Sequence, residues 1–452
     1  MQTISVKKSL YRLTMPIFID IALVMLLGAV DTVMLSRYSD DAVAAVGLDN
    51  QLISFVFLIY QFISMGAAII CAQYFGAGLR KRFMQIVWIA AIVNIVLGLI
   101  VSGSLWLWSE ELLRAFGLRE QLIADGARYL EITGSLSFFQ ALSLTFSAAL
   151  RSTGKTVKPM LVTVIVNIIN MLANYALIFG NWGCPAMGVE GAAWASAFSR
   201  IAATLILLSF MPSIWRAGSP AYYIPFRNYF RPFPWSEMKN LFKIGIPAMS
   251  EEMSYSLSQI VITYFINQIS TEALTTKVYC STTITFVILF STSIVQGGDI
   301  LVGHYVGQLR YRAAYILGNF VYHRGRMLTL IVAGALAAGG HSLMTLLTDN
   351  ADIIRAGTWI FIIDFFLSYG RVKNVFACGT LRATGDAVYP VIVGVICQWS
   401  VAVGIAWCLG IPMGLGIIGM WIGFCLDENL RGVILMKRWH SLKWKGKSFA
   451  QK

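Results

Sequence analysis

The stretch LRSTGKTVKP at residues 150–159 recurs as LRATGDAVYP at residues 381–390, an offset of 231 positions. The same offset places PIFID, which begins at Pro16, over PAMSE, which begins at Pro247. Chance would not hold one offset over so many positions. The chain therefore contains an internal repeat, and this repeat decides how its helices are organised.

The composition is that of a protein whose surface faces lipid. Hydrophobic residues make up 57% of the 452 residues and charged residues only 13%. Soluble domains carry roughly 25% charged residues, so we predict an all-α integral membrane protein. A helix needs about 20 apolar residues to cross the hydrocarbon core. Such runs predict about twelve membrane helices, at residues 14–37, 51–75, 86–108, 126–150, 158–180, 189–213, 240–268, 281–306, 327–347, 355–381, 388–410 and 414–436.

Each copy of the repeat holds six of these helices. Because six is even, both copies enter the membrane from the same side as parallel repeats. The offset falls to 228 where Gly191 of MGVEG corresponds to Gly419 of LGIIG, so one loop is three residues shorter in the second copy. Two pseudo-symmetric bundles that rock against each other are a transporter plan. The predicted parts are an N-lobe at 1–213, a cytoplasmic connector at 214–237, a C-lobe at 238–436 and a basic cytoplasmic tail at 437–452.

The formal net charge of +13 reflects membrane topology rather than nucleic-acid binding. Basic residues occupy alternate connections, at Lys7 and Lys8, Arg80 to Arg82, Arg151 and Lys155, Arg310 and Arg312, and Lys443 to Lys447. The intervening connections are acidic or neutral. Positive loops stay in the cytoplasm, so we expect a multi-pass protein of a bacterial-type cytoplasmic (inner) membrane with both termini cytoplasmic. The expected partners are the lipid bilayer and a small molecule, with no nucleic acid.

Two carboxylates lie inside the first predicted span. An ionisable residue there costs roughly 2.5–3.5 kcal/mol and is a functional candidate. Asp31 follows Asp20 by eleven residues, which returns it to nearly the same helix face. Asn170 and Asn174 share one face of the fifth span. These four side chains either hold helices together through hydrogen bonds or line one ion-coupling and substrate cavity.

The second copy has its own charged residues inside predicted spans, namely Glu251, Glu252, Asp364, Arg371 and Lys373. An unpaired buried charge is expensive, so the two cations are expected to pair with the carboxylates. A structural polar network and a second ion or substrate site remain alternatives for this set.

The chain shows no phosphate-binding glycine loop, zinc motif or catalytic triad. We therefore expect no enzyme activity and no cofactor beyond a coupling ion, H⁺ or Na⁺. Without a nucleotide-binding domain, transport would use an ion gradient or simple facilitation. A membrane enzyme is the most distant alternative, because no clustered catalytic groups support it.

Four ordered motifs resemble the multidrug and toxic compound extrusion (MATE) transporters of the MOP flippase superfamily. They are VDTVMLSRYSDDAVAAVGL at 30–48, AQYFGAG at 72–78, ALRSTGKTVKP at 149–159, and NYALIFG at 174–180 with PAMGVEGAAWAS at 185–196. The resemblance implies two six-helix lobes in a V shape that export amphipathic, often cationic, compounds in exchange for Na⁺ or H⁺. We expect such an antiporter, acting as a monomer. The runner-up is a lipid-linked precursor flippase of the same superfamily.

The resemblance also implies roles for residues of the first copy. Asp31 matches the family's ion-coupling aspartate, with Asn170 and Asn174 completing a cation site that could take Na⁺. Some members carry Asp where this chain has Asn174, which removes one carboxylate. Ser196 stands where the family often has Thr. Pro16 matches a proline implicated in helix bending, and Pro247, its repeat counterpart, is a second candidate hinge.

The second copy departs from the family pattern. Members with a second coupling site carry Glu where this chain has Tyr255, and Asp where it has Arg371. A cation site of that kind in the C-lobe is therefore doubtful, and the N-lobe site is favoured. The resulting hypothesis is that a proton or cation at Asp31 excludes substrate, and that its loss restores a negative site for a cationic substrate.

Overall fold

The computed structural model describes residues 2–212 and 229–451, which contain helices and no strand. The chain divides into two compact units, which we call the N-terminal bundle (Met15–Gly245) and the C-terminal bundle (Met1–Thr14 with Ile246–Lys452). The chain passes between them within two long helices, α1 (Gln2–Ser36) and α11 (Trp235–Ile269). The chain changes bundle between Thr14 and Met15 in α1, and between Gly245 and Ile246 in α11. In each helix one residue separates this point from a proline, Pro16 or Pro247.

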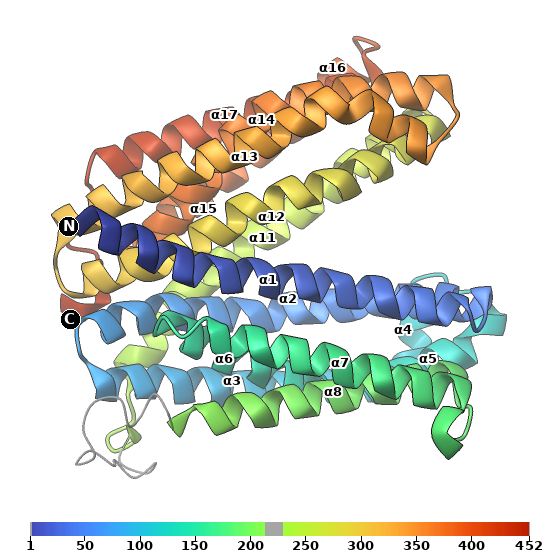
Figure 1. Ribbon diagram of the computed structural model, residues 1–452, viewed down its shortest axis with the longest axis horizontal. Coiled ribbons are helices and arrows are strands. Elements are labelled where there is room, and N and C mark those ends of the chain that lie inside the picture. The colour runs from blue at the N-terminus through green and yellow to red at the C-terminus, as the bar shows by residue number, and fades with distance from the viewer. Residues whose placement is uncertain (1, 213–228, 452) are drawn as a thin grey trace. The chain divides into compact units, whose positions relative to one another are not determined.

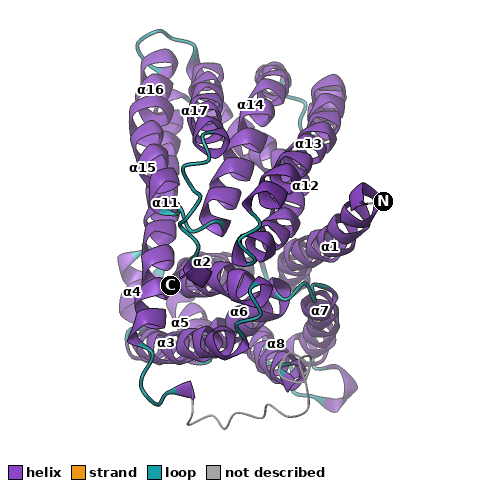
Figure 2. Ribbon diagram, turned by 90° about the vertical axis from the view of Figure 1, so that its left-hand side faces the viewer, coloured by secondary structure: helices purple, strands orange, loops and turns teal. Residues whose placement is uncertain are grey.

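The N-terminal bundle is built from antiparallel helices (Figures 1 and 2). After α1 come α2 (Asp40–Gly76), α3 (Arg80–Leu107), α4 (Ser109–Ala115), α5 (Glu120–Ser135), α6 (Ser137–Ser152), α7 (Val157–Phe179) and α8 (Gly188–Phe210). Helix α2 packs on α3, α5 and α6, and α7 packs on α8. A core that includes Ile53, Tyr60, Leu130 and Ala193 fills the space between them.

The C-terminal bundle repeats this order. After α11 come α12 (Thr271–Gly307), α13 (Tyr311–Leu347), α14 (Ala351–Ala383), α15 (Val388–Cys397), a π-helical turn (Gln398–Val403), α16 (Gly404–Gly410) and α17 (Gly416–His440). Its aromatic core stacks Trp439 on Trp444, with Phe376 at the edge of Trp439.

The helix bounds follow the sequence repeat. Helices α2 and α12 each have 37 residues and begin after a serine, Ser39 or Ser270, whose side chain accepts a backbone N–H of the first turn. Such N-caps stabilise a helix start. The loop between α7 and α8 covers residues 180–187, whereas its counterpart between α16 and α17 covers 411–415. The shorter loop predicted for the second copy is confirmed.

The structure refines two predicted spans. The span 126–150 consists of two helices, α5 and α6, which break at Leu136 (φ −101°, ψ 10°). Ser137, the first residue after the break, bonds with Tyr60 and Ser102 through its hydroxyl group, and these bonds hold the break in place. The span 388–410 contains the π-helical turn. The predicted connector at 214–237 lies largely outside the described residues.

In the described part of the chain, eight helices are long and apolar enough to cross a membrane. The eight include α2, α3, α12 and α13 and four further spans at 7–36, 157–179, 188–210 and 388–410. The predicted spans within α11, α14 and α17 are not among them, and all three helices contain ion-paired charged residues. A membrane helix can keep charged residues, and so be less apolar in composition, when ion pairs inside the bundle neutralise these charges.

Close helix packing at the loop of unequal length depends on glycine in both copies. A Cβ on Gly191 would lie 2.5 Å from the carbonyl oxygen of Leu177, and one on Gly419 would lie 2.7 Å from the carbonyl carbon of Leu409. Neither backbone can yield without moving a helix. Small residues at such crossings let membrane helices approach.

We therefore expect Gly191→Ala to lower the thermal unfolding midpoint of the detergent-solubilised protein by several degrees. Gly103→Ala is the matched control, because a Cβ on Gly103 of α3 meets nothing within 4 Å and alanine favours helix by about 1 kcal/mol over glycine. A midpoint equal to or above that of the control would show that the contact at Gly191 is not tight.

Candidate functional site

The predicted residues Asp31, Asn170 and Asn174 come together between α1 and α7 of the N-terminal bundle. Asn174 Nδ2 donates hydrogen bonds to Asp31 Oδ1 at 2.7 Å and to Asn170 Oδ1 at 3.0 Å. Asn170 and Asn174 are each 1% exposed, and Asp31 is partly buried. The two asparagines are four residues apart and so share one face of α7. One amide thus joins the carboxylate of α1 to α7.

The other polar atom of the Asn174 side chain is its amide oxygen, Oδ1. Asn174 Oδ1 is buried and has no hydrogen-bond partner among the described residues, which is costly for an acceptor. A proton on Asp31 or a small hard cation would satisfy it once the amide turned. Carboxylate and amide oxygens are the ligands that hard cations prefer. Asp31, Asn170 and Asn174 therefore offer a donor set that fits Na⁺, whereas no cluster of His, Cys, Asp and Glu in the described chain fits a bound metal.

Ser196 lies on α8 and reaches this site through residues that the sequence analysis did not identify. It forms a hydrogen bond with Tyr129 of α5, which interacts electrostatically with both Asp31 and Arg200. Arg200 lies one turn after Ser196. Its guanidinium donates to the Thr133 carbonyl oxygen at 3.2 Å and acts electrostatically on Asp31. A cation inside the predicted span 189–213 was the available signal for Arg200.

Asp20 is not part of this set, although it shares the helix. It is 2% exposed, forms a salt bridge with Arg151 at the end of α6, and accepts a hydrogen bond from the Thr163 hydroxyl of α7. Its oxygens are thus paired within a structural clamp that joins three helices. No bond in the described chain connects Asp20 to Asp31 or to the two asparagines.

The clamp is duplicated in the C-terminal bundle. Glu251 and Arg382, the repeat counterparts of Asp20 and Arg151, form the same salt bridge. Glutamate is one methylene longer than aspartate, and room is available because Gly394 stands where the first copy has Thr163. A Cβ at Gly394 would lie 3.3 Å from Glu251 Cγ. The repeat therefore preserves the ion pair, although the carboxylate is longer and the neighbouring residue is smaller in the second copy.

A second contact between the same pair of helices is also repeated. Asn167 Nδ2 donates to the carbonyl oxygen of Leu23 at 2.8 Å in the N-terminal bundle. At the corresponding positions the Ser254 hydroxyl donates to Gln398 Oε1 at 2.8 Å. These contacts carry structure rather than function, because both copies retain them with different side chains.

The set of Asp31, Asn170 and Asn174, in contrast, is present once. The positions that correspond to Asp31, Asn170 and Asn174 at an offset of 231 are Ile262, Val401 and Ile405. All three counterparts are apolar, so the C-terminal bundle cannot bind an ion at this level. Any coupling ion bound between these two helices is therefore confined to the N-terminal bundle.

The predicted cations of the C-terminal bundle have partners, although not all of the expected ones. Arg371 contacts Asp364 at 3.4 Å, and Asp364 also accepts from the Ser368 hydroxyl at 3.1 Å. Lys373 lies over the ring of Tyr369, 3.7 Å from its centroid. These contacts stabilise α14. Neither cation pairs with Glu251, which Arg382 occupies instead.

Helix α17 adds a charged group that the sequence analysis did not identify. Arg431 is bound to Asp427 at 2.6 Å and to Glu428 at 3.2 Å, and Glu428 accepts from Asn374 of α14 at 2.8 Å. Their spacing of three and four residues inside the predicted span 414–436 was the sequence signal. These bonds extend the structural network from α14 to α17.

Glu252 and Tyr255 differ from this network because they are exposed. Tyr255 is 43% exposed, and Glu252 on the same helix is exposed as well. Tyr255 lies within electrostatic reach of Arg371 and Glu428. The two residues therefore border the network on the surface of α11 rather than form an enclosed site.

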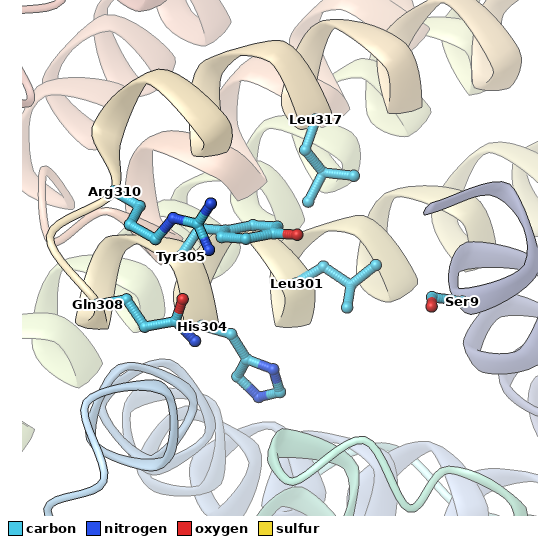
Figure 3. A pocket seen from close by; sticks show the side chains of 7 residues that line it. All are labelled: Ser9, Leu301, His304, Tyr305, Gln308, Arg310 and Leu317. Carbon is cyan, nitrogen blue, oxygen red and sulfur yellow. The ribbon is translucent and has the colours of Figure 1, made fainter. Parts of the chain in front are cut away.

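A separate cavity of about 300 Å³ lies in the C-terminal bundle at the end of α12 (Figure 3). It is lined by Ser9, Leu301, His304, Tyr305, Gln308, Arg310 and Leu317. The Arg310 guanidinium lies over the ring of Tyr305, 5.6 Å from its centroid. None of the predicted site residues lines this cavity, so it is distinct from both polar sets.

Comparisons with known proteins agree with this architecture. The MatE family matches residues 16–176 and 247–408, two stretches that begin at Pro16 and Pro247. YisQ of Bacillus subtilis, described as an uncharacterized transporter, is 36% identical over 450 residues, covering 98% of this chain and 96% of the relative. A probable multidrug resistance protein NorM of Thermotoga maritima is 29% identical, with coverage of 97% and 93%. The outward-facing structure of a multidrug resistance MATE family transporter of the MOP superfamily has a TM-score of 0.85 at 16% identity, with 97% of both chains covered.

The two repeated bundles and these matches define a membrane transporter. The chain belongs to the MATE family of multidrug efflux transporters. It is therefore a multi-pass membrane protein that handles small molecules and not an enzyme, as its relatives' family implies. The family resemblance found in the four sequence motifs is confirmed.

The duplicated clamp allows a matched stability test. Breaking a buried pair by removing one partner costs about 3–5 kcal/mol, and less where solvent reaches the pair. The Arg382 side chain is 7% exposed, whereas that of Arg151 is 33% exposed. We expect Arg382→Met to lower the thermal unfolding midpoint in detergent more than Arg151→Met does. Equal losses, or the reverse order, would contradict this account of the two clamps.

Proposed function

We propose that the protein is a secondary active antiporter that exports amphipathic cations in exchange for H⁺ or Na⁺ bound at Asp31. The observation that carries the proposal is the bond from Asn174 Nδ2 to Asp31 Oδ1, together with the unpartnered Oδ1 of the same amide. An ionisable group at membrane depth that has a donor but no counter-ion on its own helix is suited to gain and lose a small cation.

Asn174 would report the occupancy of Asp31 to α7. With Asp31 ionised, the amide donates its N–H to the carboxylate, as the structure has it. With a proton or Na⁺ on Asp31, the N–H would face a group that no longer attracts it, and the amide oxygen would become the better partner. The amide would then turn, which would also release or remake its bond to Asn170. Ion occupancy is thus coupled to the contact between α1 and α7.

Exclusion of substrate follows from charge. An ionised Asp31 provides one negative charge for a cationic substrate in surroundings of low dielectric constant, where the attraction is strong. A bound proton or Na⁺ cancels that charge, so substrate and coupling ion would compete. Arg200 opposes a second positive charge at the same place. Competition of this kind is all that an exchanger requires of its binding site.

Movement is proposed at the two prolines. Each lacks the N–H that would bond to the residue four positions earlier, which weakens the helix locally. Pro16 lies in α1, 15 residues before Asp31, and Pro247 takes the corresponding place in α11. The crossing of the chain between the bundles falls beside each of them. We propose that both act as hinges when the bundles alternate access to the site, with Asp20 and Glu251 fixing the helix beyond the hinge.

The proposed setting is a bacterial cytoplasmic membrane, with both termini in the cytoplasm. Support comes from the basic connections, which stay on the cytoplasmic side. Each chain contains both bundles, so the proposed functional unit is a monomer. The lipid-linked precursor flippase is not favoured, because Arg371 and Lys373 are engaged by Asp364 and Tyr369 rather than open to an anionic head group.

The role of Asp31 is tested in proteoliposomes loaded with a fluorescent monocation such as ethidium, under imposed pH and Na⁺ gradients. We expect Asp31→Asn to abolish gradient-driven efflux, because asparagine cannot exchange a proton and binds cations weakly. Asp125→Asn, an exposed aspartate of α5, is the control and should transport like the wild type. Full gradient-driven efflux by Asp31→Asn would refute the proposal.

A further inference from the structure

Asp49 of α2 is the most completely buried carboxylate outside the site already described. It is 0% exposed, and neither of its oxygens has a hydrogen-bond partner among the described residues. The sequence analysis passed over it because the predicted span began at residue 51. Helix α2 begins at Asp40, so Asp49 lies roughly 14 Å along the helix from its first residue.

The surroundings of Asp49 are apolar. A Cβ placed on Gly126 of α5 would lie 3.5 Å from Oδ2 of Asp49. The same Cβ would lie 3.1 Å from carbon atoms of both Leu113 and Leu118. A Cβ at Gly126 would therefore be in ordinary van der Waals contact with the carboxyl group. Helices α3 and α6 also pack on α2, yet neither oxygen of Asp49 is paired with a charged side chain in the described part of the chain.

Such a site selects a proton over every other ligand. An ionised carboxylate without a donor or counter-charge is strongly unfavourable in an apolar interior. A metal ion would need several oxygen ligands, whereas only the two oxygens of Asp49 are present. A proton on one of these oxygens makes the group neutral and needs no further ligand.

Asp49 is connected to the Asp31 site through Tyr129. The Tyr129 hydroxyl donates to Oδ1 of Asn50, the neighbour of Asp49, at 3.4 Å. It also bonds with Ser196 and interacts electrostatically with Asp49 and Asp31. Tyr129 stands on α5, the helix that bears Gly126 and that ends at the Leu136 break. A shift of this short helix would therefore change the surroundings of both carboxylates.

We propose that Asp49 is a second proton-binding site of the N-terminal bundle, which exchanges its proton during the transport cycle in step with Asp31. The inference rests on the proposed antiport. The O–H bond at Asp49 breaks when α5 moves and water reaches the carboxyl group, and the proton leaves to bulk solvent. The bond reforms with a proton from the opposite side when the pocket closes. Each cycle then carries one proton more than Asp31 alone accounts for.

The number of protons exchanged per exported ethidium is measured in Na⁺-free proteoliposomes. It follows from the pH gradient that holds a given ethidium gradient without net flux. Asp49→Asn keeps the shape of the side chain, and we expect the number of protons per exported cation to fall by one. Where asparagine disturbs folding, Asp49→Ser replaces it. An unchanged ratio in a folded variant overturns the proposal.

A second measurement separates this proposal from the antiport itself. Infrared difference spectra of the purified protein should show a carbonyl band of a neutral carboxylic acid at neutral pH. We expect the double variant with Asp49→Asn to lose one carboxylic-acid band that is present in Asp31→Asn. Identical spectra of the two variants in this region overturn the proton at Asp49. Ethidium export in the wild type that neither a pH gradient nor a Na⁺ gradient drives contradicts the antiport alone, since the infrared result does not depend on transport.

Discussion

The hydrogen bond between Asp31 and Asn174 is the interaction on which the functional account depends. A carboxylate among membrane helices must find donors or a cation, because the lipid offers neither. Here one amide supplies the donor at 2.7 Å and keeps its own oxygen unpartnered. The ionised carboxylate therefore has a donor, and we propose that the unpartnered oxygen finds its partner when Asp31 holds a small cation. A group with two such states can act as a switch between α1 and α7.

The internal repeat shows which polar contacts are structural. Both copies keep the clamp, as Asp20 with Arg151 and as Glu251 with Arg382. Only the first copy has a carboxylate at the level of Asp31, since the second has Ile262 there. A symmetrical frame therefore carries an asymmetrical site. The frame sets where the helices lie, and the Asp31 set, which is present once, is the proposed place at which an ion competes with a substrate.

Much of the fold could be predicted from the sequence, because lipid burial requires long apolar helices and the repeat has a fixed offset. The contact of Asp31 with the Asn174 amide was also within reach, since helical spacing placed both asparagines on one face. The burial of Asp49 and the ion pair of Glu251 with Arg382 were not. Burial of Asp49 depends on a helix that begins nine residues before it and on the packing of α5 against α2, and ion pairs depend on which helices pack together. Periodicity along one helix contains neither fact.

The central claim is that the coupling ion and a cationic substrate exclude each other at Asp31. It is tested most directly by equilibrium binding of ethidium to the purified protein, followed by fluorescence polarisation while Na⁺ is raised or pH is lowered. The account predicts that the apparent Kd rises in proportion to the concentration of the competing ion, and that this dependence disappears in Asp31→Asn. An apparent Kd that neither protons nor Na⁺ change in the wild type would contradict it.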